Sequence, residues 1–348
     1  MTAAHKPVLL DIQHLSKSFV RSRDLLGRPR ETVRAVRDIS FSVRQGETLG
    51  IVGESGSGKS TLGRSILRLE APEEGTVLYR GQDLLRLGKR AMRRQRRDLQ
   101  MIFQDPFASL DPTKTVGNAI SEPLRIYERL SRAEYELRVA DLLTKVGLRT
   151  EFAARYPAEM SGGQRQRVAI ARALALDPKI IVADEAVSAL DVSTQSEVIN
   201  LLVHLAKEFE LTCLFISHNL GVVRHISDRI AVMYLGRIVE IGTAAQVYDT
   251  PRHPYTQALL SAIPVPDPAI QRARAKTILD GDSPDPAHPP AGCSFASRCP
   301  FSQDVCTSIE PALERRADGS MSACHFADTI FQQRTMSGST DMLAARTS

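Results

Sequence analysis

Hydrophobic residues along the chain form short strand-like runs that alternate with stretches of helical periodicity. Leu49, Ile51 and Val52 predict a buried strand, and Leu62 and Ile66 begin a helical pattern after it. Further strands are predicted at 8–20, 35–43, 99–104, 179–184, 212–217, 229–234 and 237–241. Helices are predicted at about 115–127, 132–147, 161–176, 193–209, 243–249 and 254–262. The alternation favours an α/β fold.

Two stretches depart from this alternation. Residues 105–178 contain helical patterns without a strand, which predicts a helical insertion in a sheet domain. Residues 21–34 are basic and contain Gly27 and Pro29, which predicts a surface loop. Residues 86–98 are the densest basic run; they fit a solvated helix face, or a surface for phosphate, lipid head groups or an acidic partner. The run lacks interleaved aromatic residues, so it does not favour nucleic-acid stacking.

Composition and charge restrict the class of protein only loosely. The 348 residues include 45 basic and 40 acidic side chains, a mixture that does not indicate nucleic-acid binding. No apolar stretch is long enough to span a bilayer, and the N-terminus lacks an apolar signal region. We therefore expect a cytoplasmic protein that reaches a membrane only through partners. Its five cysteines do not indicate a disulfide framework in that compartment.

The strand that ends at Val52 leads directly into a phosphate-binding loop. The pattern needs two glycines separated by four residues and then Lys-Ser, and the chain supplies it between strand and helix. Backbone amides and the helix N-terminus would surround the phosphates of a nucleotide. Lys59 would reach the β- and γ-phosphates and Ser60 would ligate Mg²⁺. The predicted loop residues are Gly53, Glu54, Ser55, Gly56, Ser57, Gly58, Lys59, Ser60 and Thr61.

Three later residues complete a predicted nucleotide triphosphatase site. Asp184 ends an apolar strand and would help to hold Mg²⁺, while Glu185 would orient the attacking water. His218 follows another strand at the sheet edge where ligands bind in open α/β folds, which favours a γ-phosphate contact. Phe19 could stack on adenine, although a core aromatic fits the sequence nearly as well.

Residues 161–165, Ser-Gly-Gly-Gln-Arg, resemble the signature of ABC transporter ATPases. The other family landmarks occur in the expected order and cover nearly the whole chain. These landmarks are the phosphate loop, Gln104, Ser161–Gln164, the acidic strand 180–185, Ser188-Ala189-Leu190-Asp191 and His218. The resemblance implies a P-loop NTPase of the ABC nucleotide-binding type, with an antiparallel β subdomain, a helical subdomain and a small cysteine-containing extension.

The resemblance also implies how two chains would cooperate. Ser161, Gly162, Gly163 and Gln164 would face the ATP bound by a second ABC ATPase subunit, so that two ATP molecules are sandwiched. Gln104 would sense the γ-phosphate and contribute to the Mg²⁺ site, and Asp191 would link the two sites. We expect an ABC domain at 1–265, with the helical subdomain at about 105–178, an extension at 266–330 and a disordered tail at 331–348.

Several motifs make the chain similar to ATP-binding subunits of dipeptide and oligopeptide importers, and more similar to the F-type of their two paralogous ATPases. They include Gln-Asp-Pro-Phe-Ala-Ser-Leu-Asp-Pro at 104–112 and Pro-Arg-His-Pro-Tyr at 251–255. The expected partners are a second ATPase subunit, two membrane permeases and an extracytoplasmic binding protein, at the cytoplasmic face of the inner membrane. Importers of nickel, glutathione or oligosaccharide remain alternatives, as does a soluble ABC-type ATPase in DNA repair or translation. Ala186 and Asn219 replace the family's usual Pro and Asp.

Four cysteines lie in a Pro-rich segment after the ATPase motifs. A short region with little core of its own would gain stability from a bound metal. Three interpretations stay open: an iron–sulfur cluster, zinc, or unliganded thiols. The spacings do not match a C-x₂-C zinc pattern, and the family resemblance implies a 4Fe–4S cluster in some members. The residues are Cys293, Cys299, Cys306 and Cys324, while Cys213 fits a buried strand.

Overall fold

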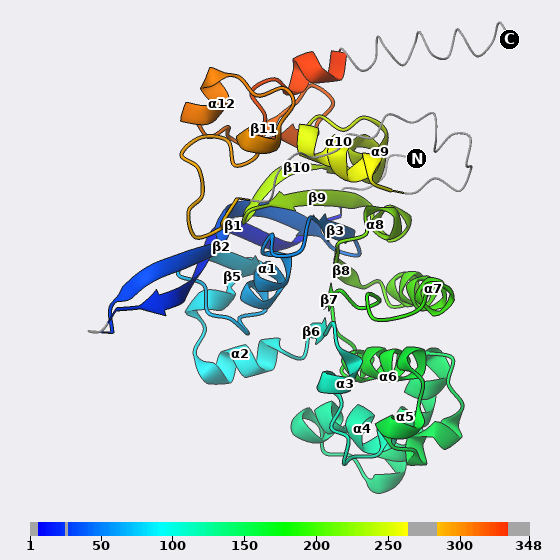
Figure 1. Cartoon of the computed structure of the whole chain (residues 1–348). Helices are drawn as coiled ribbons and strands as arrows, with labels where there is room; N and C mark the ends of the chain where they lie inside the picture. Colours follow the sequence, from blue (N-terminus) through cyan, green and yellow to red (C-terminus); the bar gives the residue numbers. More distant parts are fainter. Residues whose placement is uncertain (1–5, 25–26, 264–283, 333–348) are drawn as a thin grey trace, which may run out of the picture.

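The computed structural model describes residues 6–24, 27–263 and 284–332, which form two sheets with helices around them (Figure 1). A four-stranded sheet has the order β2-β1-β4-β5 and an eight-stranded sheet has the order β11-β12-β10-β9-β3-β8-β7-β6. The smaller sheet contains β1 (Val8–Arg23), β2 (Pro29–Arg44), β4 (Glu74–Tyr79) and β5 (Gln82–Asp83). The larger contains β3 (Thr48–Val52), β6 (Leu99–Ile102), β7 (Ile180–Asp184), β8 (Thr212–Ser217), β9 (Arg229–Tyr234), β10 (Arg237–Thr243), β11 (Glu314–Arg315) and β12 (Met321–Ser322).

The centre of the larger sheet is parallel and buried on both faces. β3 pairs in parallel with β8 and β9, and β7 pairs in parallel with β8 and β6. Every residue of β3 and β7 is buried, which explains why both strands are mostly apolar. The helices that follow or flank these strands are α1 (Lys59–Ile66), α2 (Lys89–Gln95), α7 (Val192–Glu208), α8 (Leu220–Ile226), α9 (Ala244–Asp249) and α10 (Pro254–Ser261).

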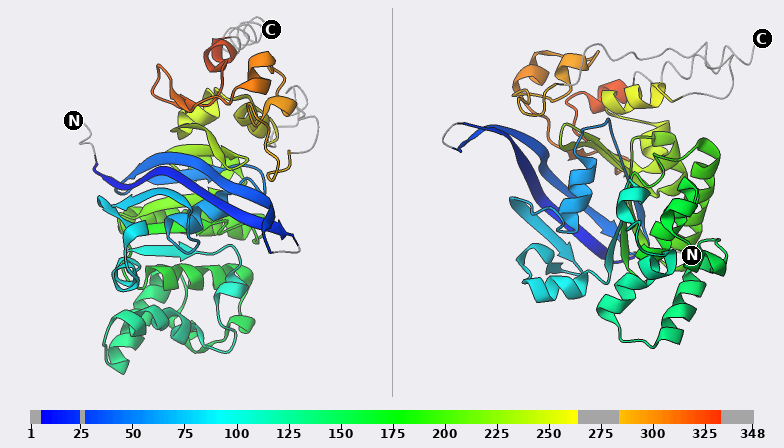
Figure 2. Two further views of the ribbon diagram at one scale, coloured as in Figure 1. Left: turned by 90° about the vertical axis from the view of Figure 1, so that its left-hand side faces the viewer. Right: turned by 60° about the horizontal axis from the view of Figure 1, so that its bottom comes forward.

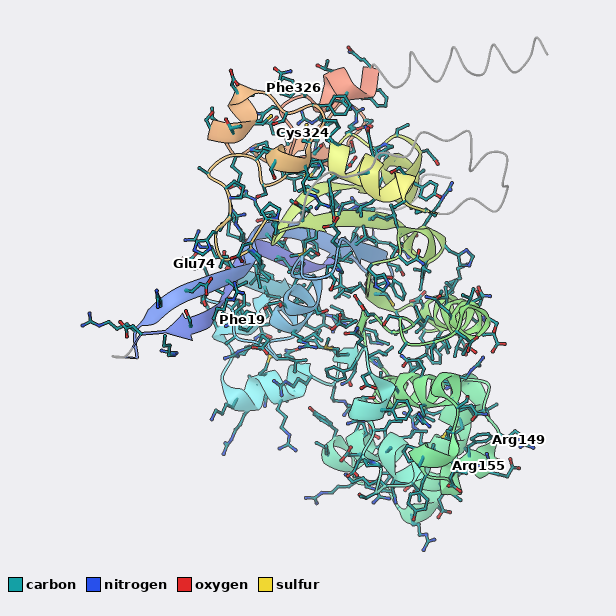
Figure 3. All side chains as sticks on the ribbon, viewed as in Figure 1. Phe19, Glu74, Arg149, Arg155, Cys324 and Phe326 are labelled. Carbon is teal, nitrogen blue, oxygen red and sulfur yellow. The ribbon has the colours of Figure 1, made fainter. Side chains whose placement is uncertain are left out.

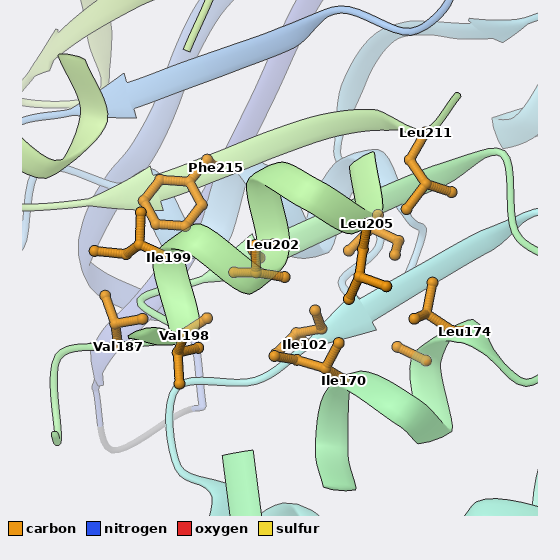
Figure 4. Packing of buried hydrophobic residues seen from close by; sticks show 14 of the residues in the cluster. Ile102, Ile170, Leu174, Val187, Val198, Ile199, Leu202, Leu205, Leu211 and Phe215 are labelled. Atoms are coloured by element: carbon orange, nitrogen blue, oxygen red, sulfur yellow. The ribbon is translucent and has the colours of Figure 1, made fainter. Parts of the chain in front are cut away.

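The segment between β6 and β7 is helical, as the sequence predicts. It lies at the end of the molecule opposite the C-terminal region in both views of Figure 2. Its apolar residues continue the core, with Ile170 and Leu174 packed near Ile102, Leu202 and Leu205 (Figure 4). The helices are α3 (Pro106–Ser109), α4 (Val116–Tyr127), α5 (Arg132–Lys145) and α6 (Gly162–Leu174).

The prediction of a surface loop at 21–34 is wrong. β1 continues to Arg23 and β2 begins at Pro29, so the two strands form a long hairpin that projects from the sheet (Figure 1). Phe19 pairs with Val33 and Val20 with Thr32 across the hairpin. β-Branched residues favour extended backbone, and here they outweigh the basic composition that indicated a loop.

The C-terminal region adds strands to the edge of the larger sheet. β12 pairs with β10 and β11 pairs with β12, both in antiparallel fashion. Short helical turns precede them, including α12 (Asp304–Ser308), and residues 327–332 are helical. The predicted disordered tail at 331–348 therefore begins inside a helix, and its remaining residues, 333–348, lie outside the described residues. Among the described residues, no helix is both long and apolar enough to cross a lipid bilayer.

Glu240 on β10 connects the sheet to the segment before α10. Its carboxylate accepts the backbone N–H groups of Arg252, at 2.7 Å, and His253, at 3.0 Å. The side chain is buried, and burial raises the pKa of this carboxyl group to about 7 despite the hydrogen bonds that it accepts.

We predict that Glu240→Gln changes how stability depends on pH. Between pH about 4.5 and 7 the folded protein binds a proton at Glu240 that the unfolded chain has released, so wild-type stability falls as pH rises through this window. The glutamine has no such titration, so the variant should gain up to about 3 kcal/mol relative to wild type between pH 4.5 and 7.5. Urea unfolding at several pH values measures this difference.

An exposed glutamate provides the control for loss of one negative charge. Glu73→Gln removes one negative charge at an exposed position and is measured beside Glu240→Gln at each pH. Identical pH slopes for wild type and Glu240→Gln would contradict the assigned role of burial.

Candidate functional site

The predicted site residues gather where parallel strands of the larger sheet end. The phosphate loop follows β3, Asp184 is the last residue of β7, His218 follows β8 and Gln104 lies just beyond β6. Neighbouring parallel strands carry their carboxyl ends to one edge, which is where ligands bind in open α/β sheets. The fold therefore brings together side chains that are far apart in the sequence.

Two glycines allow the phosphate loop to pack closely against neighbouring backbone. A Cβ atom on Gly53 would lie 2.1 Å from the Met233 carbonyl oxygen, and one on Gly58 would lie 1.9 Å from that of Ala35. Gly58 also has φ near +98°, a conformation that favours glycine. The Gly236 N–H donates to the Ser57 carbonyl at 3.0 Å, so the turn between β9 and β10 supports the loop from outside.

Lys59 points into the phosphate loop. Its ammonium donates to the carbonyl oxygens of Gly53 and Glu54, both at 2.8 Å, and lies 3.4 Å from the Ser57 hydroxyl. The side chain is buried, and burial lowers the pKa of Lys59 while the nearby carboxylates of Glu185, Asp184 and Glu54 oppose that shift. A buried ammonium inside a ring of backbone dipoles is suited to an anionic group such as a phosphate.

Ser60 and Asp184 form a pair whose chemistry fits a divalent cation. The Ser60 hydroxyl donates to Asp184 Oδ1 at 2.6 Å. Asp184 is fully buried, and its Oδ2 accepts no hydrogen bond; the nearest cation is the Arg64 guanidinium at 3.7 Å. Burial raises the pKa of Asp184, opposed by the bond from Ser60. A hydroxyl beside a carboxylate with a free oxygen supplies the hard oxygen ligands that Mg²⁺ prefers.

Glu185 lies between Gln104 and His218. The Gln104 side-chain amide donates to Glu185 Oε2 at 2.9 Å, and His218 Nδ1 lies 3.4 Å from Glu185 Oε1. Glu185 has φ near +46°, a left-handed conformation that is costly for a side chain of this size. Its backbone N–H is fixed by the Ile216 carbonyl at 2.9 Å. Strain of this kind collects at functional sites, where surrounding structure holds a side chain in place.

The residues predicted as the ABC signature begin α6 and pack on α7. The Ser161 hydroxyl accepts the Gln164 N–H and the Gln164 side chain accepts the Ser161 N–H, which makes a capping box. A Cβ atom on Gly163 would lie 2.3 Å from Thr194 on α7, and one on Gly162 would lie 3.4 Å from Leu190. Glycines at this helix start therefore permit close contact with Leu190 and with the next helix.

Asp191 caps α7 in this structure. It accepts the Ser193 hydroxyl at 2.6 Å and the Thr194 N–H at 3.0 Å. These hydrogen bonds lower the pKa of Asp191 to about 2. The capping contacts are local, so within one chain Asp191 has a structural role that is separate from the predicted link between two sites.

The two departures from the family pattern lie directly beside residues of the site. Ala186 is buried directly after Glu185. Asn219 accepts the N–H groups of Gly221 and Val222 and so caps α8, as an aspartate would. Neither residue contributes a side chain to the contacts between Gln104, Glu185 and His218.

Phe19 lies on the hairpin strand β1, partly exposed (Figure 3). It pairs with Val33, two residues before Ala35, whose carbonyl touches Gly58 of the phosphate loop. The Lys17 ammonium lies 5.0 Å from the ring centroid. An exposed ring on this side of the loop is compatible with adenine stacking.

The sequence did not indicate two residues that hold the phosphate loop. The Tyr255 hydroxyl accepts the Glu54 N–H at 2.9 Å, and Arg298 of the C-terminal region contacts the Glu54 carboxylate. Tyr255 lies in the motif at 251–255, which is a local signal that could have identified it. No local signal indicates Arg298, because it is 244 positions away from Glu54.

The four C-terminal cysteines line a small apolar cavity with His253 and aromatic rings (Cys324 and Phe326 are labelled in Figure 3). All four are free thiols, and burial raises the pKa values of Cys299 to about 11 and of Cys324 to about 12. In the described part of the chain, no three cysteine sulfurs lie within 4.8 Å of one another. Four thiols around one cavity form a ligand set that either zinc or an iron–sulfur cluster could use.

Protein-family models match two parts of the chain. Residues 36–188 match the model described as "ABC transporter". Residues 239–306 match the model described as "Oligopeptide/dipeptide transporter, C-terminal region".

Curated relatives match nearly the whole chain. The oligopeptide transport ATP-binding protein AppF of Bacillus subtilis is 50% identical over 326 residues, which cover 93% of this chain and 99% of that protein. The dipeptide transport ATP-binding protein DppF of Haemophilus influenzae is 46% identical over 320 residues, 92% of this chain and 97% of that protein.

A solved structure of an ATP-binding cassette also matches the chain. The dimeric ATP-binding cassette MJ0796, bound to ADP and Pi in a post-hydrolysis state, matches with a TM-score of 0.61 and 31% identity. The match covers 68% of this chain and 98% of the cassette. This chain therefore belongs to the ABC transporter ATP-binding subunits that carry the oligopeptide/dipeptide transporter C-terminal region.

Proposed function

We propose that the protein hydrolyses ATP to power the import of dipeptides and oligopeptides through a membrane ABC transporter. The observation that carries the ATPase assignment is the convergence of Lys59, the Ser60–Asp184 pair and Glu185 at one sheet edge. The cargo assignment rests on similarity to peptide-transport ATPases along nearly the whole chain. We propose as partners a second, paralogous ATPase subunit, two permeases and an extracytoplasmic binding protein, with no role for nucleic acid.

In the proposed reaction each residue near the phosphate loop has one role. Lys59 and the loop amides bind the β- and γ-phosphates, with the Lys59 ammonium moving from loop carbonyls to phosphate oxygens. Ser60 and Asp184, with Gln104, would hold Mg²⁺, whose charge stabilises the negative charge that develops on the phosphates. Catalysis then depends mainly on positioning and electrostatics rather than on covalent intermediates.

Glu185 is the residue proposed to act on water. Its carboxylate is held by Gln104 and faces His218, so it can orient a water molecule in line with the γ-phosphate and accept its proton. His218 would stabilise the γ-phosphate. Gln104 contacts the proposed catalytic carboxylate and lies two residues before α3, the first helix of the helical segment, so it is placed to relay nucleotide state to that segment.

The signature completes a site only across a dimer in this proposal. Ser161, Gly162, Gly163 and Gln164 would bind the γ-phosphate on the partner ATPase, and Asp191 would connect the two sites. Phe19 would stack on adenine. We propose the domain division 1–265, with a helical subdomain at about 105–178, followed by an extension at 266–330 and a tail at 331–348. The subunit would sit at the cytoplasmic face of the membrane, held there by the permeases.

We predict that Glu185→Gln nearly abolishes turnover while ATP still binds. The amide cannot accept a proton from water, which should lower the ATPase rate of the assembled transporter by at least about 100-fold. A fluorescent nucleotide measures binding and phosphate release measures turnover. Glu197→Gln on α7, which removes a carboxylate that pairs with Arg167, is the matched control and should hydrolyse ATP as wild type does. Normal hydrolysis by Glu185→Gln would remove Glu185 from its proposed role.

The cargo is tested by uptake in cells. A strain that lacks this chain should lose uptake of a labelled dipeptide, a labelled pentapeptide or both, and keep uptake of nickel. Complementation with wild type should restore the loss and complementation with Glu185→Gln should not. Loss of nickel uptake alone would overturn the peptide assignment and leave the ATPase mechanism in place.

We infer that the four C-terminal cysteines hold a 4Fe–4S cluster, because four thiols line one cavity and match the ligand count of such a cluster. Protein purified without oxygen should contain about four irons and four sulfides per chain. Cys324→Ser should lose most of this iron, whereas Cys213→Ser on β8 should keep it. Stoichiometric zinc, or protein without metal, would contradict the cluster.

A further inference from the structure

The phosphate loop is joined to the cysteine-rich C-terminal region by a two-pronged ion pair. Arg298 Nη1 donates to Glu54 Oε2 at 3.0 Å, and Nη2 donates to Glu54 Oε1 at 3.2 Å. Glu54 follows Gly53 in the loop, whereas Arg298 directly precedes Cys299. A bidentate guanidinium–carboxylate contact fixes orientation as well as distance, which a single hydrogen bond does not.

The arginine is held in a buried position. Its side chain is only 9% exposed, and Nη1 also lies 3.4 Å from the Tyr234 hydroxyl. Ion pairs at exposed sites contribute little, but a pair that is largely shielded from water is far more costly to break. Removing one partner here would leave the other charge partly buried.

A cluster of three aromatic rings packs beside the ion pair. The rings of Tyr234, Tyr255 and Phe295 have centroids 4.6–5.5 Å apart, and all three are buried. Tyr234 ends β9 and Tyr255 belongs to α10. Phe295 belongs to the segment between Cys293 and Cys306, which we call the cysteine loop. The cluster therefore links the sheet, the segment after it and the loop that carries Arg298.

The conformation of the cysteine loop sets where Arg298 lies. The Ala296 N–H donates to the Cys293 carbonyl at 3.0 Å, and the Cys293 N–H donates to the Cys306 carbonyl at 2.7 Å. The Arg298 N–H donates to the Phe295 carbonyl at 3.0 Å. Backbone groups of Cys293 and Cys306 therefore help to fix the turn that positions the Arg298 guanidinium.

Three contacts restrain Glu54 and thereby the phosphate loop that contains it. Its carboxylate meets Arg298, its N–H donates to Tyr255 and its carbonyl accepts from Lys59. A change in the direction of the side chain would turn the peptide unit whose carbonyl contacts the Lys59 ammonium. The contact with Arg298 is therefore coupled to the residue proposed to bind phosphate.

We propose that Arg298 is a positioning residue for nucleotide binding, through which the cysteine-rich region holds the phosphate loop in its binding shape. The proposal rests on the proposed role of this loop as the ATP site. Arg298 acts on the loop through Glu54 and not through the residues assigned to hydrolysis, so it should affect the affinity for ATP more than the rate of hydrolysis once ATP is bound.

We predict that Arg298→Met weakens ATP binding by about tenfold, because loss of a buried, charge-assisted contact frees Glu54 from the binding geometry. Equilibrium titration of the purified chain with a fluorescent ATP analogue measures the affinity. In the assembled transporter KM for ATP should rise by a similar factor, while kcat stays within about twofold of wild type. Arg298→Lys, which keeps the charge but not the two-pronged contact, should recover only part of the loss.

Glu310→Gln is the matched control. Glu310 also joins the C-terminal region to the core, since it pairs with Arg37 on β2 and Arg237 on β10, but it does not contact the phosphate loop. General loosening of the region would weaken ATP binding in Glu310→Gln as much as in Arg298→Met, and that result would overturn the proposal. If Arg298 acts specifically on the phosphate loop, Glu310→Gln should bind ATP with an affinity close to that of wild type.

A double-mutant cycle tests whether Arg298 acts through Glu54. Glu54→Gln should weaken binding, and Arg298→Met should add little to the double variant. Additive effects would overturn the proposal even if each single change is harmful. Lys59→Ala tests the ATP site separately from the role of Arg298. If Lys59→Ala binds ATP as wild type does, the assignment of the loop as the ATP site fails. If Lys59→Ala loses ATP binding while Arg298→Met keeps the wild-type affinity, only the role of Arg298 is refuted.

Discussion

Close contact between the phosphate loop and two neighbouring pieces of backbone constrains everything around the site. Gly53 lies against the carbonyl of Met233 on β9, and Gly58 lies against that of Ala35 on β2. Neither position has room for a Cβ atom, so the loop can only sit where the large sheet and the hairpin sheet meet. Strand β2 of the hairpin, strand β9 and the turn at Gly236 support this one loop from several sides. A backbone held in this way can present amide groups without reorganising when an anion arrives.

Buried charge is the second determinant of the site. Lys59, Asp184 and Glu185 are brought close together at the strand ends, where water is largely excluded, and each would be costly alone. The structure compensates them with the Ser60 hydroxyl, with loop carbonyls and with the Gln104 amide. The compensation is incomplete at Asp184 Oδ2, and Glu185 has an unfavourable backbone conformation. Both features fit a site whose residues are arranged for a charged substrate and its cation rather than for stability alone.

The parts of this arrangement that the sequence predicted are those encoded locally. The phosphate loop, Asp184 and His218 each follow a short apolar run, and parallel strands bring such ends together whatever their separation in the chain. The hairpin at 21–34 was missed because basic residues and Gly27 resemble a loop, although pairing between β-branched residues decides the conformation. The contact of Arg298 with Glu54 could not be predicted, since it depends on how a region with little regular structure docks on the core. Two-residue strands such as β11 and β12 likewise carry no periodic signal, because pairing of β12 with β10 and of β11 with β12 creates them.

The strand pairing of the C-terminal region also has a consequence for the behaviour of the chain in concentrated solution. β10 is seven residues long, and without β12 one side of it would present unpaired N–H and C=O groups, the usual template for strand-to-strand aggregation. β12 covers part of that side, the Ala323 N–H bonds to the Val239 carbonyl beside it, and the new outer strand, β11, has only two residues. Short outer strands offer little to a second molecule. The region therefore protects the ATPase sheet from self-association, which gives it a value to the protein that does not depend on any metal or nucleotide.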